Sequence, residues 1–166
     1  MKQPGAETDN WLAARGALLV LLCLIGTAAR GADINPCLLK AAELAPVLGH
    51  LPEEGRADHD PFGVPMCVYG MKAETGRRFL LLVHATAWDR KRYEQRVTLA
   101  EGSGIRKVQV LPGVGDSAFF VEGVAGALAG HRYLELNGLK TASMRVVQPA
   151  EVTTLLKLAV DRLPKS

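Results

Sequence analysis

The chain has 166 residues, of which 48% are hydrophobic and 22% are charged, and a formal net charge of +3 at pH 7. A chain of this length typically makes one domain, without need of a second hydrophobic core. The small positive charge argues against nucleic-acid binding, which requires a strongly basic surface.

An uncharged apolar segment at residues 16–29 predicts export from the cytoplasm. Its 14 residues are too few for a helix that crosses a bilayer, which takes about 20, so the segment is typical of a signal-peptide core. Small residues at positions 27 and 29 favour cleavage after Ala29, and later positions up to residue 32 are alternative cleavage sites. An uncleaved membrane anchor is the alternative, because two acidic residues offset the two basic residues that precede the segment.

Cleavage after Ala29 leaves residues 30–166 as one domain with two cysteines, Cys37 and Cys67. Two thiols in an exported domain usually pair, and closing a loop of about 30 residues restricts the unfolded chain by roughly 3 to 4 kcal/mol. The alternatives are two buried free thiols or a redox pair, although the usual C-x-x-C spacing of the latter is absent. Lipid attachment at Cys23 is disfavoured, because Leu22 stands where a small residue is needed.

The first predicted element is a short or kinked helix. Asn35 and Pro36 suit its start, Pro46 interrupts its apolar pattern, and Gly49 ends it. Residues 50–63 are rich in Gly, Pro and Asp and predict a surface loop.

A hairpin and a second helix follow. Residues 64–71 and 78–87 form the predicted hairpin, whose second strand is apolar enough to be buried on both faces. Asp89 then caps a helix that runs to about Ala100.

A second hairpin is predicted from residues 105–110 and 117–121. The sequence LPGVGD at residues 111–116 joins them, since its proline and glycines favour turn conformations. The small-residue run at 124–130 is interpreted as a loose connector.

A third hairpin is predicted at residues 132–136 and 139–147, around Asn137 and Gly138. An Asn-Gly pair is the strongest short hairpin signal, because both central residues of the tight turn need positive φ. Residues 149–163 carry one apolar stripe at helical spacing and predict the last helix. This order of elements predicts an antiparallel α+β domain with about three helices.

The sequence lacks a recognisable catalytic or metal-binding motif. The loop residues Asp58, His59 and Asp60 are interpreted as solvated charge, and His84 as a hydrogen-bonded histidine within its strand. Ser103 lies in a turn without an obvious base, and LPGVGD lacks the Lys and Ser or Thr of a phosphate-binding loop. We therefore expect no enzymatic activity, no cofactor and no metal.

Four cations on the predicted second helix form a candidate patch for an anionic partner: Arg90, Lys91, Arg92 and Arg96. Four more lie near strand ends that could approach it: Arg77, Arg78, Arg106 and Lys107. Cations at a helix start oppose the helix dipole, which favours a role in binding lipid headgroups or cell-wall polymer. The competing interpretation is a solvated helix face.

The chain resembles small exported cell-envelope domains of unknown function, best known as actinobacterial lipoproteins. The resemblance is carried by the terminal helix and by Pro36, Cys37, Leu39, Glu43, Leu48, Gly49, Cys67, Tyr69, Gly113, Val114, Gly115, Asp116 and Ala118. The chain departs from these domains in Lys40, in Pro46 and in having no lipid-acceptor cysteine. The resemblance implies a disulfide between Cys37 and Cys67 and no known enzymatic chemistry.

These observations lead to an expected function in binding. The first hypothesis is a non-catalytic domain of the cell envelope or secreted space that binds an envelope protein, a lipid or a small ligand. The alternative is a structural protein of the membrane surface or cell wall that uses the basic helix. A hydrolase is a third hypothesis, with little support from motifs.

Overall fold

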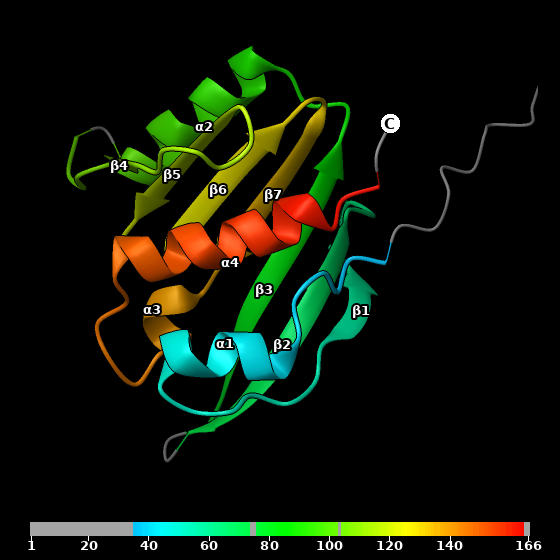
Figure 1. Ribbon diagram of the computed structural model, residues 1–166, viewed down its shortest axis with the longest axis vertical. Coiled ribbons are helices and arrows are strands. Elements are labelled where there is room, and N and C mark those ends of the chain that lie inside the picture. The colour runs from blue at the N-terminus through cyan, green and yellow to red at the C-terminus, as the bar shows by residue number, and fades with distance from the viewer. Residues whose placement is uncertain (1–34, 74–75, 103, 165–166) are drawn as a thin grey trace, which may run out of the picture. The chain divides into compact units, whose positions relative to one another are not determined.

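Seven antiparallel strands form one sheet in the order β1-β2-β3-β7-β6-β5-β4 (Figure 1). In this computed structural model the described residues are 35–164, apart from 74–75 and 103. The predicted signal peptide, its cleavage positions, Cys23 and Ser103 therefore lie outside the described residues. The strands are β1 (Arg56–His59), β2 (Pro65–Ala73), β3 (Gly76–Thr86), β4 (Gln109–Val110), β5 (Ser117–Val121), β6 (Val124–Ala129) and β7 (Arg132–Asn137).

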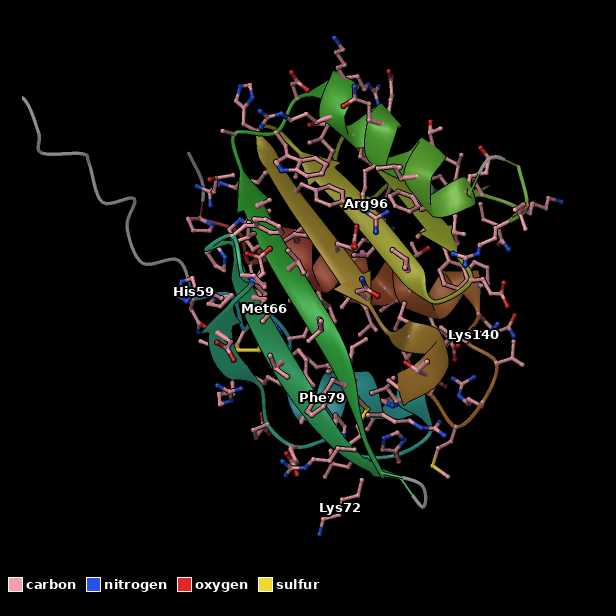
Figure 2. The ribbon with its side chains drawn as sticks, turned by 180° about the vertical axis from the view of Figure 1, so that it is seen from behind. His59, Met66, Lys72, Phe79, Arg96 and Lys140 are labelled. Atoms are coloured by element: carbon pink, nitrogen blue, oxygen red, sulfur yellow. A yellow bond between two sulfur atoms is a disulfide. The ribbon has the colours of Figure 1, made fainter. Side chains whose placement is uncertain are left out.

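Helices cover both faces of this sheet, so the predicted antiparallel α+β class is confirmed. One face carries α1 (Ala41–Leu48), α3 (Leu139–Ala142) and α4 (Pro149–Asp161), and the other carries α2 (Arg90–Glu101), as Figures 1 and 2 show. The larger core lies under α1, α3 and α4 and includes the fully buried Leu82, Leu134 and Leu156. Among the described residues, no helix is both long and apolar enough to span a bilayer.

The predicted start of the first helix is wrong. The Asn35 side-chain oxygen accepts the Cys37 amide at 3.0 Å, so this segment forms a turn. The helix begins after Lys40, whose amide donates to the Glu43 carboxylate at 2.8 Å. Pro46 lies within the helix, and Gly49 ends it with φ of 79°, as predicted.

The β1–β3 part of the sheet confirms the first hairpin and corrects the loop before it. β2 and β3 pair antiparallel along their length. Residues 56–59 of the predicted loop form the edge strand β1, which pairs with β2 from Arg56 opposite Val68 to His59 opposite Pro65. The signal for β1 is weak because an edge strand buries little side-chain surface, and three of its four residues are exposed.

The small-residue run after Val121 is the strand β6 and not the predicted connector. It pairs with β5 on one side and β7 on the other. A Cβ at Gly126 would lie 2.5 Å from the Tyr133 hydroxyl oxygen and 2.6 Å from Phe119. The side chains of this run are small because aromatic rings from the neighbouring strands lie over it. Packing between strands thus outweighs the low strand propensity of these residues.

The Asn137-Gly138 pair does not form the predicted hairpin turn. β7 ends at Asn137, and Gly138, with φ of 91°, leads into the helix α3. A strand at residues 139–147 would have no partner beside β7, because β3 and β6 already occupy both of its edges. The hairpin that β7 does form joins it to β6.

The remaining elements agree with the expectations except at their ends. Asp89 caps α2 through its carboxylate, which accepts the Arg92 amide at 2.8 Å. The expected strand at 105–110 is reduced to Gln109–Val110. The last helix ends at Asp161, close to the predicted 163.

The disulfide between Cys37 and Cys67 is present, with Cα atoms 4.9 Å apart. It joins the segment before α1 to the sheet strand β2. The Tyr69 hydroxyl donates to the Leu39 carbonyl at 2.7 Å, and Arg162 forms a bidentate ion pair with Glu43. These three contacts hold the N-terminal segment against both the sheet and the end of α4.

Candidate functional site

The predicted basic patch on α2 does not form one exposed surface, because Arg96 points into the protein (Figure 2). Its guanidinium donates to both carboxylate oxygens of Glu135 on β7, at 2.7 and 2.8 Å. The Tyr133 hydroxyl donates to the same carboxylate at 2.6 Å. This contact with Glu135 is the main reason that the pKa of Arg96 is raised. Arg96 thus fastens α2 to the sheet.

Two of the other cations on α2 also have partners within the protein. Arg90 forms a hydrogen bond to Ser117 and lies 3.9 Å from the Glu94 carboxylate. Arg92 donates to the Ala87 carbonyl at 3.0 Å. Arg90, Lys91 and Arg92 are all exposed, so three of the four predicted cations stay at the surface of α2, and Arg90 has the Glu94 carboxylate beside it.

The cations expected to approach this patch divide between distant parts of the sheet. Arg77 donates to Glu53, and Arg78 donates to the Thr141 carbonyl, beside the β2–β3 hairpin. That hairpin lies at the end of the sheet remote from α2 (Figure 1). Arg106 and Lys107 instead line a groove with residues of α3.

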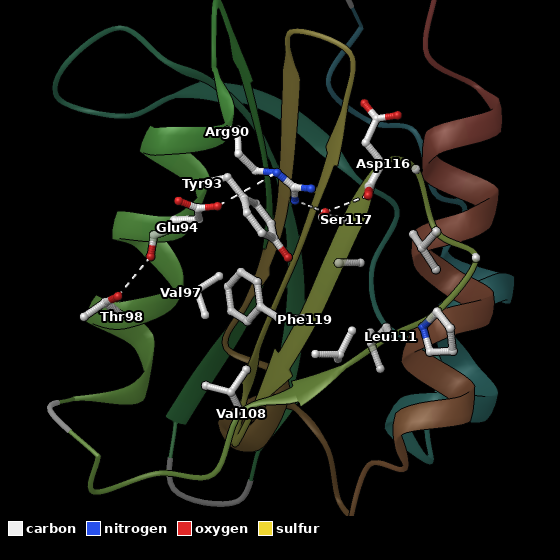
Figure 3. A pocket seen from close by; sticks show the side chains of 16 residues that line it. Arg90, Tyr93, Glu94, Val97, Thr98, Val108, Leu111, Asp116, Ser117 and Phe119 are labelled. Atoms are coloured by element: carbon white, nitrogen blue, oxygen red, sulfur yellow. Dashed lines mark hydrogen bonds and ion pairs between the residues drawn. The ribbon is translucent and has the colours of Figure 1, made fainter.

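A groove beside α2, of about 490 Å³, opens between this helix and the β4–β5 edge (Figure 3). Its walls are largely apolar and include Val97, Val108 and Phe119. The charged side chains that line it are one cation and two carboxylates, Arg90, Glu94 and Asp116. Arg90 is engaged as described, so this groove offers no excess positive charge.

The LPGVGD sequence borders the α2 groove and has a structural role. Gly115 has φ of 52°, and a Cβ there would lie 2.4 Å from the Leu128 carbonyl oxygen. The Asp116 carboxylate accepts the Gly130 amide at 2.6 Å. These contacts fasten the β4–β5 turn to the β6–β7 hairpin. The LPGVGD sequence thus joins two strands, as predicted.

A larger groove of about 780 Å³ lies on the opposite face of the β4–β5 edge, and we call it the basic groove. Side chains alternate along a strand, so Gln109 and Phe120 face this groove while Val110 and Phe119 face the α2 groove. Its lining comes from the 105–109 segment, β5, α3 and the loop before α4. Phe120 forms its apolar floor with 7% of the residue exposed, and Leu139 lies beneath it with no exposed surface.

Among the described residues, the basic groove is lined by four cations, Arg106, Lys107, Lys140 and Arg145, and by one carboxylate, Glu122. The hydrogen bond from Lys140, with its charge and that of Arg106, lowers the pKa of Glu122, so this carboxyl is ionised at neutral pH. Even with Glu122 ionised, the lining is net positive. Volumes of this size and a mostly apolar lining with a few charged groups are typical of ligand sites.

The cations of the basic groove differ in how firmly the protein holds them. Lys140 is paired with Glu122 (Figure 2 labels Lys140). Arg145 donates to the Pro46 carbonyl at 2.7 Å and pairs with Glu151. Arg106 and Lys107 have exposed side chains and no ion pair with a described residue. These two cations are therefore the most available to a ligand.

A second apolar surface lies on β2 and β3. It is on the same face of the sheet as α2, and that helix does not cover it. It is formed by Met66, Val68, Phe79, Leu81 and Val83. Figure 2 shows Met66 and Phe79 on this face, and Phe79 is 45% exposed. The surface is an open row of partly exposed side chains, so the prediction that β3 is buried on both faces is wrong.

The remaining predicted residues are Asp58, His59 and Asp60 at β1 and His84 in β3. Asp58 pairs with Arg56 along β1, while the Asp60 carboxylate accepts the amides of Phe62 and Val64. Among the described residues, no group of His, Cys, Asp and Glu has the arrangement of a metal site. The expected hydrogen bonds of His84 are absent: it is fully buried, and both ring nitrogens lack a partner.

Sequence reasoning missed the basic groove because its lining comes from segments that are far apart in the chain. Lys140 and Arg145 belong to the predicted strand at 139–147. An extended strand would hold these two side chains far apart. The helix α3 and the following loop instead bring them beside Arg106 and Lys107. The one local signal was the set of cations at 106–107 directly after the acidic end of α2.

Comparison of the chain with models of protein families, with curated proteins and with solved structures gave no match.

Proposed function

We propose that the protein is an exported, non-catalytic domain that binds, in the basic groove, a small ligand with an anionic group and an apolar part. The observation that carries this proposal is the combination of four cations with a buried apolar floor in a groove of about 780 Å³. An apolar floor supplies burial, and cations at the rim supply orientation toward an anion.

A binding function is favoured over a catalytic one by the surroundings of the histidines. The Nδ1 atoms of His50 and His131 face backbone carbonyl oxygens. Burial is the main factor that lowers the pKa of His84, with the nearby charge of Arg132 as a smaller one, and its ring is sealed from solvent. A general base must instead reach a nucleophile and the substrate.

Export is supported by the predicted signal peptide and by the disulfide, since disulfides persist in oxidising compartments. The resemblance to actinobacterial envelope domains belongs to the same proposal. Several residues that carry it have structural roles: the two cysteines, Glu43, Tyr69 and Gly115. The resemblance therefore supports a shared scaffold, and the proposed ligand site depends on the basic groove alone.

The proposal is tested by titrating the oxidised protein, residues 30–166, with anilinonaphthalene sulfonate, whose rings are apolar and whose sulfonate is anionic. We expect saturable binding that Arg106→Glu with Lys107→Glu weakens strongly, because these exposed cations line the groove. Lys72→Glu with Lys91→Glu is the matched control, since it makes the same change of charge at exposed positions outside the groove. Equal binding by both double variants would contradict the proposal.

A further inference from the structure

Apolar side chains project into solvent at the rim of the basic groove. Ile105 is 87% exposed, Met144 is 77% exposed and Val146 is 78% exposed. All three line the groove, although they come from two loops that lie far apart in the sequence. Such exposed aliphatic side chains carry a cost in water that contact with an apolar phase removes.

Each of these apolar tips adjoins a cation in the chain. Ile105 precedes Arg106 and Lys107, and Arg145 lies between Met144 and Val146. Lys140 lines the same groove. The two loops thus present apolar tips and positive charge together, the combination that favours the boundary between lipid headgroups and acyl chains.

We propose that this rim docks on the surface of a bilayer that contains anionic lipid, and that the lipid is the source of the ligand of the basic groove. The inference rests on the proposed function for its location and names the partner of that site. Ile105, Met144 and Val146 enter the headgroup region, and Arg106 and Lys107 contact the anionic headgroups. The positive rim and the anionic bilayer surface attract each other, so the protein approaches the membrane before the apolar tips insert.

A bilayer fits this rim better than an acidic protein does. The apolar tips project singly from two loops and are separated by cations, so they do not form the contiguous apolar centre of a protein interface. A bilayer needs no complementary shape, because its headgroup layer adapts to each tip.

The test is cosedimentation of the oxidised protein, residues 30–166, with vesicles of phosphatidylcholine alone and with an equal part of phosphatidylglycerol. We expect binding only to the anionic vesicles and a loss of about five-fold for each of Arg106→Gln and Lys107→Gln. Ile105→Ser with Val146→Ser should weaken binding about ten-fold, because both exposed tips lose their apolar surface.

Matched controls make the test specific to this rim. Phe62→Ser with Phe79→Ser removes two exposed apolar side chains outside the groove, of which Phe62 is 91% exposed and Phe79 is 45% exposed. Lys72→Gln and Lys91→Gln remove charge elsewhere, the second from the helix first predicted to bind anions. All four control positions should leave vesicle binding unchanged.

Each outcome decides between the inference and the proposed function. If the sulfonate probe binds in the groove but anionic vesicles do not, membrane docking is wrong and the groove binds a soluble ligand. If vesicles bind but the probe does not, docking of the rim stands, while the proposed ligand site and the lipid as its ligand are both wrong. Vesicle binding that needs Arg106 and Lys107 but is unaffected at Ile105 and Val146 overturns insertion of the apolar tips and leaves an electrostatic contact with the anionic headgroups.

Discussion

His84 is a polar side chain in an apolar environment. It lies in β3 opposite Leu134 and has no exposed surface, and neither ring nitrogen forms a hydrogen bond with a described residue. Burial lowers its pKa below 6.5, and the charge of Arg132 adds to this effect. The folded protein therefore keeps His84 neutral under conditions in which an unfolded chain protonates it.

We predict that His84 makes the protein less stable in acid. The unfolded chain binds this proton as the pH falls through 6.5 and the folded protein does not, so the free energy of unfolding decreases below that pH. His84→Leu removes this dependence and, by removing an unsatisfied buried polar group, adds about 1 kcal/mol at neutral pH. Urea unfolding on both sides of pH 6.5 measures both effects.

The control for this prediction is His131→Leu, which alters an exposed histidine. It should leave the acid dependence of the wild-type protein in place. If His84→Leu keeps the same decrease in stability between neutral and mildly acidic pH, another group causes it.

At the scale of elements, α2 is the helix that depends most on a single polar contact. Only Tyr93 and Ala100 of its twelve residues are buried. The ion pair of Arg96 with Glu135 is largely shielded from solvent, with exposed side-chain fractions of 24% and 8%. Apolar burial under α2 is small, so this contact and the aromatic cluster of Tyr93, Phe119 and Tyr133 position the helix.

We predict that Arg96→Ala destabilises the protein by about 3 kcal/mol, because it leaves the Glu135 carboxylate buried without its cation. Arg92→Ala is the comparison on the same helix and should cost well under 1 kcal/mol, since its side chain is exposed. Chemical unfolding gives both values, and amide exchange should show that α2 opens first in Arg96→Ala. A similar small loss for both variants would contradict a fastening role for Arg96.

At the scale of the whole molecule, contacts distant in sequence close the fold. The disulfide spans 30 residues, and the bidentate contact between Arg162 and Glu43 joins the end of α4 to the start of α1. That contact lowers the pKa of Glu43 to about 2. The carboxylate thus contributes stability above pH 4.5, and the contribution is lost as the pH falls toward 2.

We predict that Cys37→Ser with Cys67→Ser lowers the free energy of unfolding by about 3 to 4 kcal/mol, because the unfolded chain regains the freedom of a closed loop. Chemical unfolding of the oxidised protein and of the double variant measures the difference. The wild-type protein with its disulfide reduced should match the double variant. A variant as stable as the oxidised protein would show that the covalent link adds nothing to the noncovalent contacts of this segment.

Elements with strong local signals could be predicted from the sequence. The apolar stripe of α4, the cap of α2 at Asp89 and the strand-forming runs of the β2–β3 hairpin all depend on residues close together in the chain. The α+β class follows from their order. Part of the candidate site can also be predicted, since Arg106 and Lys107 are adjacent cations near a predicted strand end.

The errors arose where distant neighbours overrule local preference. The Asn137-Gly138 signal predicts a hairpin from two residues, but β3 and β6 had already filled both edges of β7. The run around Gly126 resembles a connector until Tyr133 and Phe119 are placed over it. Arg96 belongs to a basic run in sequence, whereas Glu135, a residue 39 positions away, determines its role.

By itself, the sequence determined the fold class, the cysteines available for a disulfide and the position of the main helices, because periodicity and capping are local properties. The tertiary structure alone decided which cations meet. Arg106, Lys107, Lys140 and Arg145 line one groove because strand pairing and the α3 turn bring their segments together. The interaction between charges depends on their distance in space. For residues far apart in the chain, that distance is set only when the sheet forms.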